Sequence, residues 1–171
     1  EDCISVTNTL SFDRNDVIFT ADKDKTVADV LQQTYTDIGG NKKRLLGGVN
    51  VPAFSSVKLS FGADKTADRK PFTYDNDILT TPFAKVSFDK NGFISSFIDT
   101  VADRELVNEI PFGTFLMAED VPMSWDNWDV DADIEMKFRP CGALLERKVI
   151  SEGDVAFIIR CKYKISEKSV V

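Results

Sequence analysis

Short segments with an apolar residue at every second position recur along the chain, separated by turn-forming residues. In the clearest segment, residues 155–165, the apolar positions fall on one face of an extended strand: Val155, Phe157, Ile159, Cys161, Tyr163 and Ile165. Arg160, Lys162 and Lys164 fall on the opposite face. A two-residue period is the side-chain repeat of a half-buried β-strand. The pattern therefore predicts an all-β, antiparallel β-sandwich rather than βαβ units.

Two hairpins are predicted in the second half of the chain. Residues 143–150 form the expected neighbour of the long strand, and residues 151–154 supply the Gly and Asp of a short turn. The other hairpin is formed by residues 84–88 and 93–98, which flank the sequence Asp-Lys-Asn-Gly. Its Asn-Gly step accepts the positive φ angles that tight hairpin turns require.

The first 80 residues carry weaker strand signals. Strand cores are predicted at residues 17–19, 45–46 and 57–61. Glycine pairs at 39–40 and 47–48 are predicted to interrupt them. This part of the chain is therefore also expected to be β.

Two further stretches bear on the domain organisation. Residues 27–35 fit either a short helix, from the spacing of their valines and leucine, or a strand, which their Thr and Tyr prefer. Residues 62–82 are polar and have the composition of a linker or long loop. We therefore predict a domain boundary near residue 80, with a small β domain and polar linker over residues 1–80 and a second β domain over residues 81–171.

Composition excludes several kinds of chemistry. No histidine occurs among the 171 residues, which removes Ser/His/Asp and Cys/His catalysis and imidazole-based zinc sites. The 28 acidic and 21 basic residues give a formal net charge of -7, so nucleic acid is not an expected partner. Cys3, Cys141 and Cys161 lack CxxC spacing and are predicted to be buried, reduced thiols.

The chain carries no recognisable targeting signal. No apolar run approaches the ~20 residues of a membrane span, and residues 1–7 lack the basic start of a signal peptide. No Asn-x-Ser/Thr acceptor occurs, so a cytoplasmic location without a membrane partner is expected. Because the chain opens at Glu1 and stops on Val170-Val171, we expect a segment of a longer protein. Its open strand edges would favour self-association of the isolated segment.

The candidate site is an acid-rich stretch between residues 119 and 135 that contains no Lys or Arg. Its seven acids are Glu119, Asp120, Asp126, Asp129, Asp131, Asp133 and Glu135. Such a charge excess either raises carboxylate pKa values or calls for a cation. Ile134 and Pro140 stand where an EF-hand loop needs Gly and Glu, so that motif is rejected. A looser calcium or magnesium site and simple solvated acids both remain open.

Two tryptophans alternate with acids inside this stretch. Trp125 and Trp128 are followed by Asp126 and Asp129. Aromatic faces combined with carboxylates are typical of sugar sites, and paired carboxylates are the machinery of glycosidases. The alternative is that the tryptophans only anchor the loop to the sandwich.

These residues resemble a known family. Residues 119–122 and 125–131, the latter reading Trp-Asp-Asn-Trp-Asp-Val-Asp, closely resemble the W-D-A-W-D-V/I segment of class II α-mannosidases, glycoside hydrolase family 38. Flanking pieces that agree with the family in order are residues 8–11, 51–54, 83–92 and 102–106. Asn127 stands where the family usually has Ala, which leaves the substrate class open.

The resemblance implies a role within a larger enzyme. Members are retaining, zinc-dependent hydrolases of α-mannosides, with a catalytic α/β domain, a helical bundle and β domains, the largest a β-sandwich similar to galactose mutarotase. The resemblance implies that residues 81–171 are the first part of this large sandwich. The nucleophile, general acid and zinc ligands belong to the N-terminal catalytic domain, so this chain is expected to hold no catalytic residue, metal ligand or cofactor. Zinc is expected in the parent's catalytic domain, against which this segment would pack.

The resemblance and the residue pattern together single out five candidate cleft-facing or sugar-contacting residues: Trp125, Asp126, Trp128, Asp129 and Asp131. In the parent, an α-mannoside or mannose-containing glycan would be the ligand. Two other readings stay open. The chain could be a self-standing carbohydrate- or calcium-binding β-sandwich module, or a purely structural domain.

Overall fold

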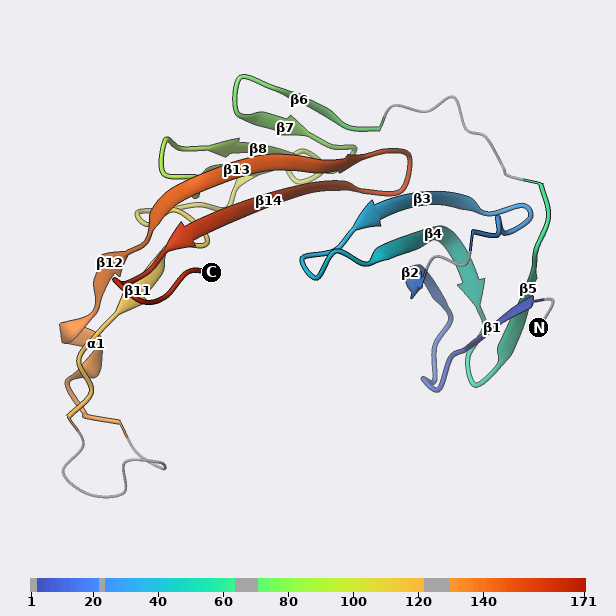
Figure 1. Cartoon of the computed structure of the whole chain (residues 1–171), viewed down its shortest axis with the longest axis horizontal. Helices are drawn as coiled ribbons and strands as arrows, with labels where there is room; N and C mark the ends of the chain where they lie inside the picture. Colours follow the sequence, from blue (N-terminus) through green and yellow to red (C-terminus); the bar gives the residue numbers. More distant parts are fainter. Residues whose placement is uncertain (1–2, 22–23, 64–70, 122–129) are drawn as a thin grey trace. The chain divides into compact units, whose positions relative to one another are not determined.

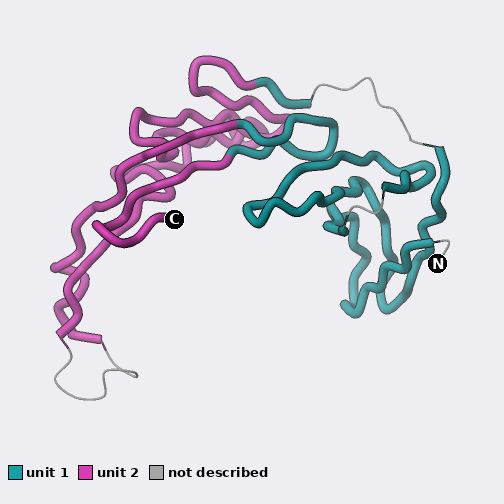
Figure 2. Tube along the Cα trace, in the orientation of Figure 1, with its two compact units in different colours: residues 1–73, 149–159 teal, residues 74–148, 160–171 magenta. Residues whose placement is uncertain are grey.

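The structure is almost entirely β. The computed structural model describes residues 3–21, 24–63, 71–121 and 130–171 (Figure 1). Among these residues the one α-helix, α1 (Ile134–Lys137), is a single turn, and every strand pair with a defined register is antiparallel. The predicted all-β, antiparallel class is therefore confirmed. The chain divides into unit 1, residues 1–73 and 149–159, and unit 2, residues 74–148 and 160–171 (Figure 2).

Unit 1 contains two small sheets. Strand β1 (Cys3–Thr7) pairs with β5 (Ser56–Ser60). The other sheet has the order β2-β4-β3, from β2 (Arg14–Ala21), β4 (Lys42–Val51) and β3 (Leu31–Thr36). The stretch that fitted both helix and strand thus enters a strand, as its β-branched and aromatic residues favour.

A β-bulge in β4 determines which of its side chains point into the core of unit 1. The predicted interruption at residues 47–48 is wrong, because β4 runs through both glycines and its register against β2 shifts there. Gly48 has φ +71°, a conformation that glycine adopts without steric penalty. The extra residue resets the alternation, so Leu46, Val49 and Val51 all lie in one buried cluster.

The tip of a later hairpin belongs to unit 1. Gln33 Oε1 accepts hydrogen bonds from the backbone N–H groups of Val155 (3.2 Å) and Ala156 (3.0 Å). Gln33 Nε2 donates to the Ala156 carbonyl (2.9 Å) and to Ser151 Oγ (2.6 Å). One side-chain amide therefore satisfies the backbone of a turn that lies more than a hundred residues further along the chain.

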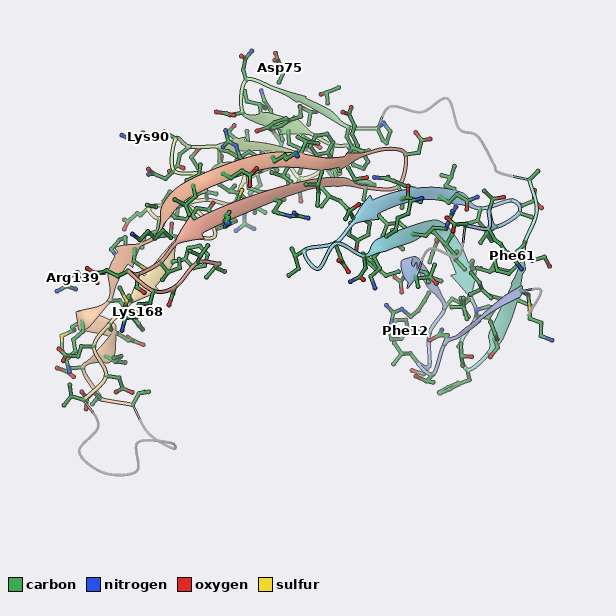
Figure 3. The ribbon with its side chains drawn as sticks, in the orientation of Figure 1. Phe12, Phe61, Asp75, Lys90, Arg139 and Lys168 are labelled. Atoms are coloured by element: carbon green, nitrogen blue, oxygen red, sulfur yellow. The ribbon has the colours of Figure 1, made fainter. Side chains whose placement is uncertain are left out.

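Unit 2 is built on a five-stranded sheet. Its order is β10-β9-β8-β7-β6. The strands are β6 (Thr73–Asp75), β7 (Ile78–Thr80), β8 (Ala84–Phe88), β9 (Ile94–Asp99) and β10 (Arg104–Glu105). The hairpin predicted around Asp-Lys-Asn-Gly is β8–β9, with Lys90 in its turn (Figure 3).

Part of the predicted linker is folded. Residues 73–80 form strands β6 and β7, so the interpretation of this stretch as a loop is wrong. Asn76 and Asp77 join the strands with φ angles of 48° and 63°, the left-handed pair of a tight hairpin turn. Composition alone did not reveal the hairpin, because the polar residues that suggested a linker are the ones that form its turn.

Four more strands complete the described chain. Strand β11 (Phe115–Met117) pairs with β12 (Arg139–Cys141), and β13 (Ala143–Glu152) pairs with β14 (Phe157–Lys164). Both strands of the last predicted hairpin are thus present, although β13 extends into the residues expected to turn. After β14 the chain turns back, and Val171 exchanges two backbone hydrogen bonds with Tyr163.

Three aromatic rings fix β14 within unit 2. The Tyr163 ring stacks on Phe93, with centroids 5.3 Å apart and planes 3° apart, and meets Phe115 edge-on at 5.2 Å. The Tyr163 hydroxyl donates to the Gly92 carbonyl at 2.7 Å. Burial raises the pKa of Tyr163 to about 12. We call Gly92, Phe93, Phe115 and Tyr163 the aromatic lock.

A second contact packs β13 on the five-stranded sheet. The Arg147 guanidinium forms an ion pair with the Asp77 carboxylate and lies 5.5 Å from the centre of the Phe88 ring. The Tyr74 hydroxyl donates to the same carboxylate at 3.3 Å. Together with the aromatic lock, these contacts set the β13–β14 pair against the sheet, as a β-sandwich requires.

Substitution of Gly92 by Ala tests the aromatic lock. A Cβ at Gly92 would lie 2.8 Å from Tyr163 Oη and 2.9 Å from Leu144 Cδ1, and φ there is +81°. We expect Gly92→Ala to lower the free energy of unfolding by about 3 kcal/mol, from backbone strain and overpacking together. Gly113→Ala is the matched control, because φ is +79° there and nothing lies within 4 Å, so only about 1 kcal/mol is expected. Equal losses in urea denaturation would contradict the lock.

Glu105 ties β10 to the strand beside it. Its Oε1 accepts from the backbone N–H groups of Phe97 (2.8 Å), Leu106 (3.0 Å) and Val107 (2.9 Å), and its Oε2 accepts from Ser96 Oγ (2.5 Å). The Ser96 bond, followed by the backbone bonds, lowers the pKa of Glu105 from 4.5 to about 2. The carboxylate therefore organises the chain only while it is ionised.

Acid titration tests this role of Glu105. Since its pKa in the folded protein lies below the unfolded value of 4.5, its stabilisation is fully present above that pH and is lost as the pH falls towards about 2. Wild type should be more stable than Glu105→Gln at neutral pH, and the gap should close near pH 2. Urea midpoints of both proteins across this range measure the gap. A gap that does not change with pH would contradict the role.

Candidate functional site

The structure describes one of the five predicted site residues. Trp125, Asp126, Trp128 and Asp129 lie outside the described residues, and their roles stay predictions. Asp131 lies within them, together with the chain on either side of the acid-rich stretch. The structure therefore describes only the residues that flank 122–129 in the sequence, and we call these flanking residues the base of the candidate site.

Strands β11 and β12 carry this base. Phe115 lies opposite Cys141, and Met117 lies opposite Arg139, which Figure 3 labels. Figure 1 shows α1 at the end of this strand pair. Backbone bonds from Ile134 N–H to the Asp131 carbonyl (3.0 Å) and from Met136 N–H to the Asp133 carbonyl (2.9 Å) form the turn that leads into α1.

One lysine neutralises the acids at this base. Lys137 Nζ lies 2.9 Å from Asp131 Oδ2 and 2.9 Å from Asp133 Oδ1. The Asp131 side chain is 18% exposed, and the Lys137 side chain is 35% exposed. The hydrogen bond with Asp131, followed by that with Asp133, raises the pKa of Lys137 above its ordinary value. Lys137 therefore remains an ammonium that bridges two carboxylates.

This bridge bears on the two outcomes expected of the charge excess, raised carboxylate pKa values or a cation. At Asp131 the second holds, because the pKa of Asp131 is lowered, chiefly by its hydrogen bond with the Lys137 ammonium. A hydrogen bond from the Val121 backbone N–H lowers it further. Lys137 was missed because it lies just beyond the acid-rich stretch. Its spacing of four residues from Asp133 is the signal that could have found it.

The described acids and cysteines do not assemble a metal site. Within residues 3–21, 24–63, 71–121 and 130–171, no group of three or more His, Cys, Asp or Glu side chains is placed to hold a metal ion. Cys3, Cys141 and Cys161 are free thiols and are partly buried. No helix in the described part of the chain has the length and apolar character needed to cross a membrane.

The described residues of each unit line a hollow. The hollow in unit 1, about 220 Å³, has an apolar floor that includes Ile18 and Val51 and is lined by the ion pair of Arg14 and Asp16. The groove in unit 2, about 320 Å³, is lined by Asp89 and Glu109 among other residues. Asp89 Oδ1 accepts from the N–H groups of Asn91 (2.8 Å) and Phe93 (2.9 Å), so it is occupied in holding its turn.

The fold and the described site define an antiparallel β protein in which one lysine bridges two aspartates at the start of a single-turn helix. Residues 79–171, more than half of the chain, match the family model described as the glycosyl hydrolases family 38 C-terminal domain. The chain therefore belongs to this family, as the Trp-Asp-Asn-Trp-Asp motif predicted. The match begins in β7 and includes the strands of the aromatic lock.

The other comparisons gave no match. Neither the curated proteins nor the solved structures contain one similar enough to this chain to be reported. The expected similarity of the sandwich to galactose mutarotase, and the looser resemblance over residues 1–80, therefore stay predictions. So does the predicted division of the chain at residue 80.

Proposed function

We propose that the chain is a non-catalytic β-sandwich segment of a retaining, zinc-dependent α-mannosidase that hydrolyses terminal α-mannosides. The observation that carries this proposal is the family match over residues 79–171. Retention requires a general acid and a carboxylate nucleophile a few ångströms apart. Since the chain has no histidine, ligands of the His/Asp type for zinc would come from the catalytic domain of the parent. This segment would pack against that domain.

The proposed contribution of this segment is to wall part of the substrate cleft. Carboxylates of Asp126 and Asp129 would accept hydrogen bonds from sugar hydroxyls, and the faces of Trp125 and Trp128 would pack on the apolar side of the sugar ring. Asp131 is a weaker candidate for sugar contact, because Lys137 already engages its carboxylate. A cytoplasmic location stays a prediction.

Hydrolysis of a chromogenic α-mannoside tests the proposal. The assay compares the 171-residue chain with the same chain extended at its N-terminus, each with and without added zinc. We expect activity only in the extended protein, and we expect zinc to be required for it. Activity in the short chain would place a catalytic centre inside these residues. Activity in neither protein would contradict the mannosidase assignment and favour a self-standing binding module, to be examined by sugar and calcium titration.

Single substitutions in the extended protein test the cleft role. We expect Asp126→Asn and Asp129→Asn to lower kcat/KM by about tenfold or more, since each removes a charged hydrogen-bond acceptor. The midpoint of thermal unfolding should stay unchanged. Asp120→Asn, in the same acid-rich stretch, is the matched control and should leave kcat/KM unaltered. Full activity in all three variants would show that the acids are only solvated, and a loss of stability would show a packing role.

A further inference from the structure

The turn of the β8–β9 hairpin, marked by Lys90 in Figure 3, holds the sole Asn-Gly step of the sequence, Asn91-Gly92. This step is chemically labile, because glycine has no side chain to shield its backbone nitrogen from the neighbouring amide. Once hydroxide has removed its proton, the Gly92 nitrogen can attack the side-chain carbonyl carbon of Asn91. A C–N bond forms, and the side-chain nitrogen takes a proton from water and leaves as ammonia. Water then opens the resulting cyclic imide to aspartate or isoaspartate.

The folded turn holds both reacting groups in hydrogen bonds. The Gly92 N–H donates to the Asp89 carbonyl at 3.0 Å, so the nitrogen that would attack is engaged. Asp89 Oδ1 accepts from the backbone N–H groups of Asn91 (2.8 Å) and Phe93 (2.9 Å). On the side chain, Asn91 Nδ2 lies 3.5 Å from Asp89 Oδ2. Because a hydrogen-bonded amide loses its proton only after its bond opens, the turn must open before the Gly92 nitrogen can react.

The aromatic lock restrains the same glycine. The Tyr163 hydroxyl donates to the Gly92 carbonyl at 2.7 Å, and the Tyr163 ring stacks on Phe93. Gly92 and Phe93 are buried, whereas Asn91 is exposed and lines the groove of unit 2. Water and hydroxide therefore reach the amide of Asn91, and the freedom of Gly92 limits the reaction.

We propose that Asn91 is a deamidation site whose rate is set by opening of the aromatic lock. While the Tyr163 hydroxyl holds Gly92, the turn keeps its hydrogen bonds and the reaction is slow. When the lock opens, the Gly92 N–H is released and the imide forms. The proposal does not depend on the mannosidase role, since every contact it uses lies within unit 2.

Deamidation would prevent the lock from closing again. Isoaspartate carries the main chain through its side-chain carbon, so it lengthens the backbone beside Gly92. That glycine is closely packed, because even a Cβ there would lie 2.8 Å from Tyr163 Oη. Either product also places a carboxylate at position 91 beside the carboxylate of Asp89, where an amide now donates. The modification therefore converts a transient opening of the lock into a permanent one.

Peptide mass spectrometry of the 171-residue chain, incubated at constant pH and temperature, measures this reaction. Conversion of the Asn91 amide to an acid gives a defined mass increase in the fragment that contains residues 91–92. We expect the folded wild type to react at least about a hundredfold more slowly than a free peptide of residues 87–95. Tyr163→Phe, which keeps the ring and loses the hydroxyl, should react about tenfold faster than the wild type.

Two variants control this experiment. Tyr35→Phe removes the hydroxyl of a tyrosine in unit 1 and should leave the rate unchanged. Asn91→Gln should suppress the mass increase at this position, since a glutamine forms the corresponding larger imide more slowly. Wild-type deamidation as fast as that of the free peptide, or equal rates in the wild type and a folded Tyr163→Phe protein, would overturn the proposal.

A second measurement decides the proposal if Tyr163→Phe does not fold. Hydrogen exchange of the Gly92 amide in the wild type reports how often its bond to the Asp89 carbonyl opens. We expect urea below the unfolding transition to accelerate this exchange and the deamidation of Asn91 by the same factor, because both need a free Gly92 N–H. Accelerated exchange with unchanged deamidation would overturn the proposal.

Discussion

The hydrogen bond from the Tyr163 hydroxyl to the Gly92 carbonyl is the constraint on which unit 2 depends. It joins positions 71 residues apart and brings β14 onto the turn of the β8–β9 hairpin. The bond can form only because Gly92 has no side chain, since a Cβ there would lie within 2.8 Å of the hydroxyl. Phe93 and Phe115 pack against the ring of the same tyrosine. One tyrosine and one glycine thus join the first and last strands of the β8–β14 region, which lies within the family match.

The sequence predicted those parts of the fold that depend on residues close together in the chain. The β8–β9 hairpin follows from its Asn-Gly turn, and β14 follows from the two-residue period that ends at Ile165. Long-range contacts carry no such periodic signal. Nothing near Gln33 indicates that its amide will bind a turn at residues 155–156, and nothing near Gly92 points to Tyr163. Such pairings are decided by packing, which a local pattern does not encode.

The candidate site shows the same division. The alternation of tryptophans and aspartates identified the family, which the match over residues 79–171 confirmed. The electrostatic interpretation of the acids left two outcomes open, raised carboxylate pKa values or a cation, because it counted charges along the sequence and stopped short of Lys137. In space, that lysine bridges Asp131 and Asp133 and lowers the pKa of Asp131. The charge balance of an acid-rich stretch thus depends on the residues that flank it in the sequence as much as on those within it.

The central proposal is that these residues shape the substrate cleft of a glycosidase whose reacting groups lie outside this chain. A crystal structure of the extended protein with a bound α-mannoside tests it directly, through the distances from the sugar hydroxyls to the carboxylates of Asp126 and Asp129. We expect at least one such distance near 3 Å, with the attacking carboxylate and the zinc ligands supplied from outside this chain. A sugar bound away from residues 125–129, or attacked by a carboxylate of residues 79–171, would contradict it.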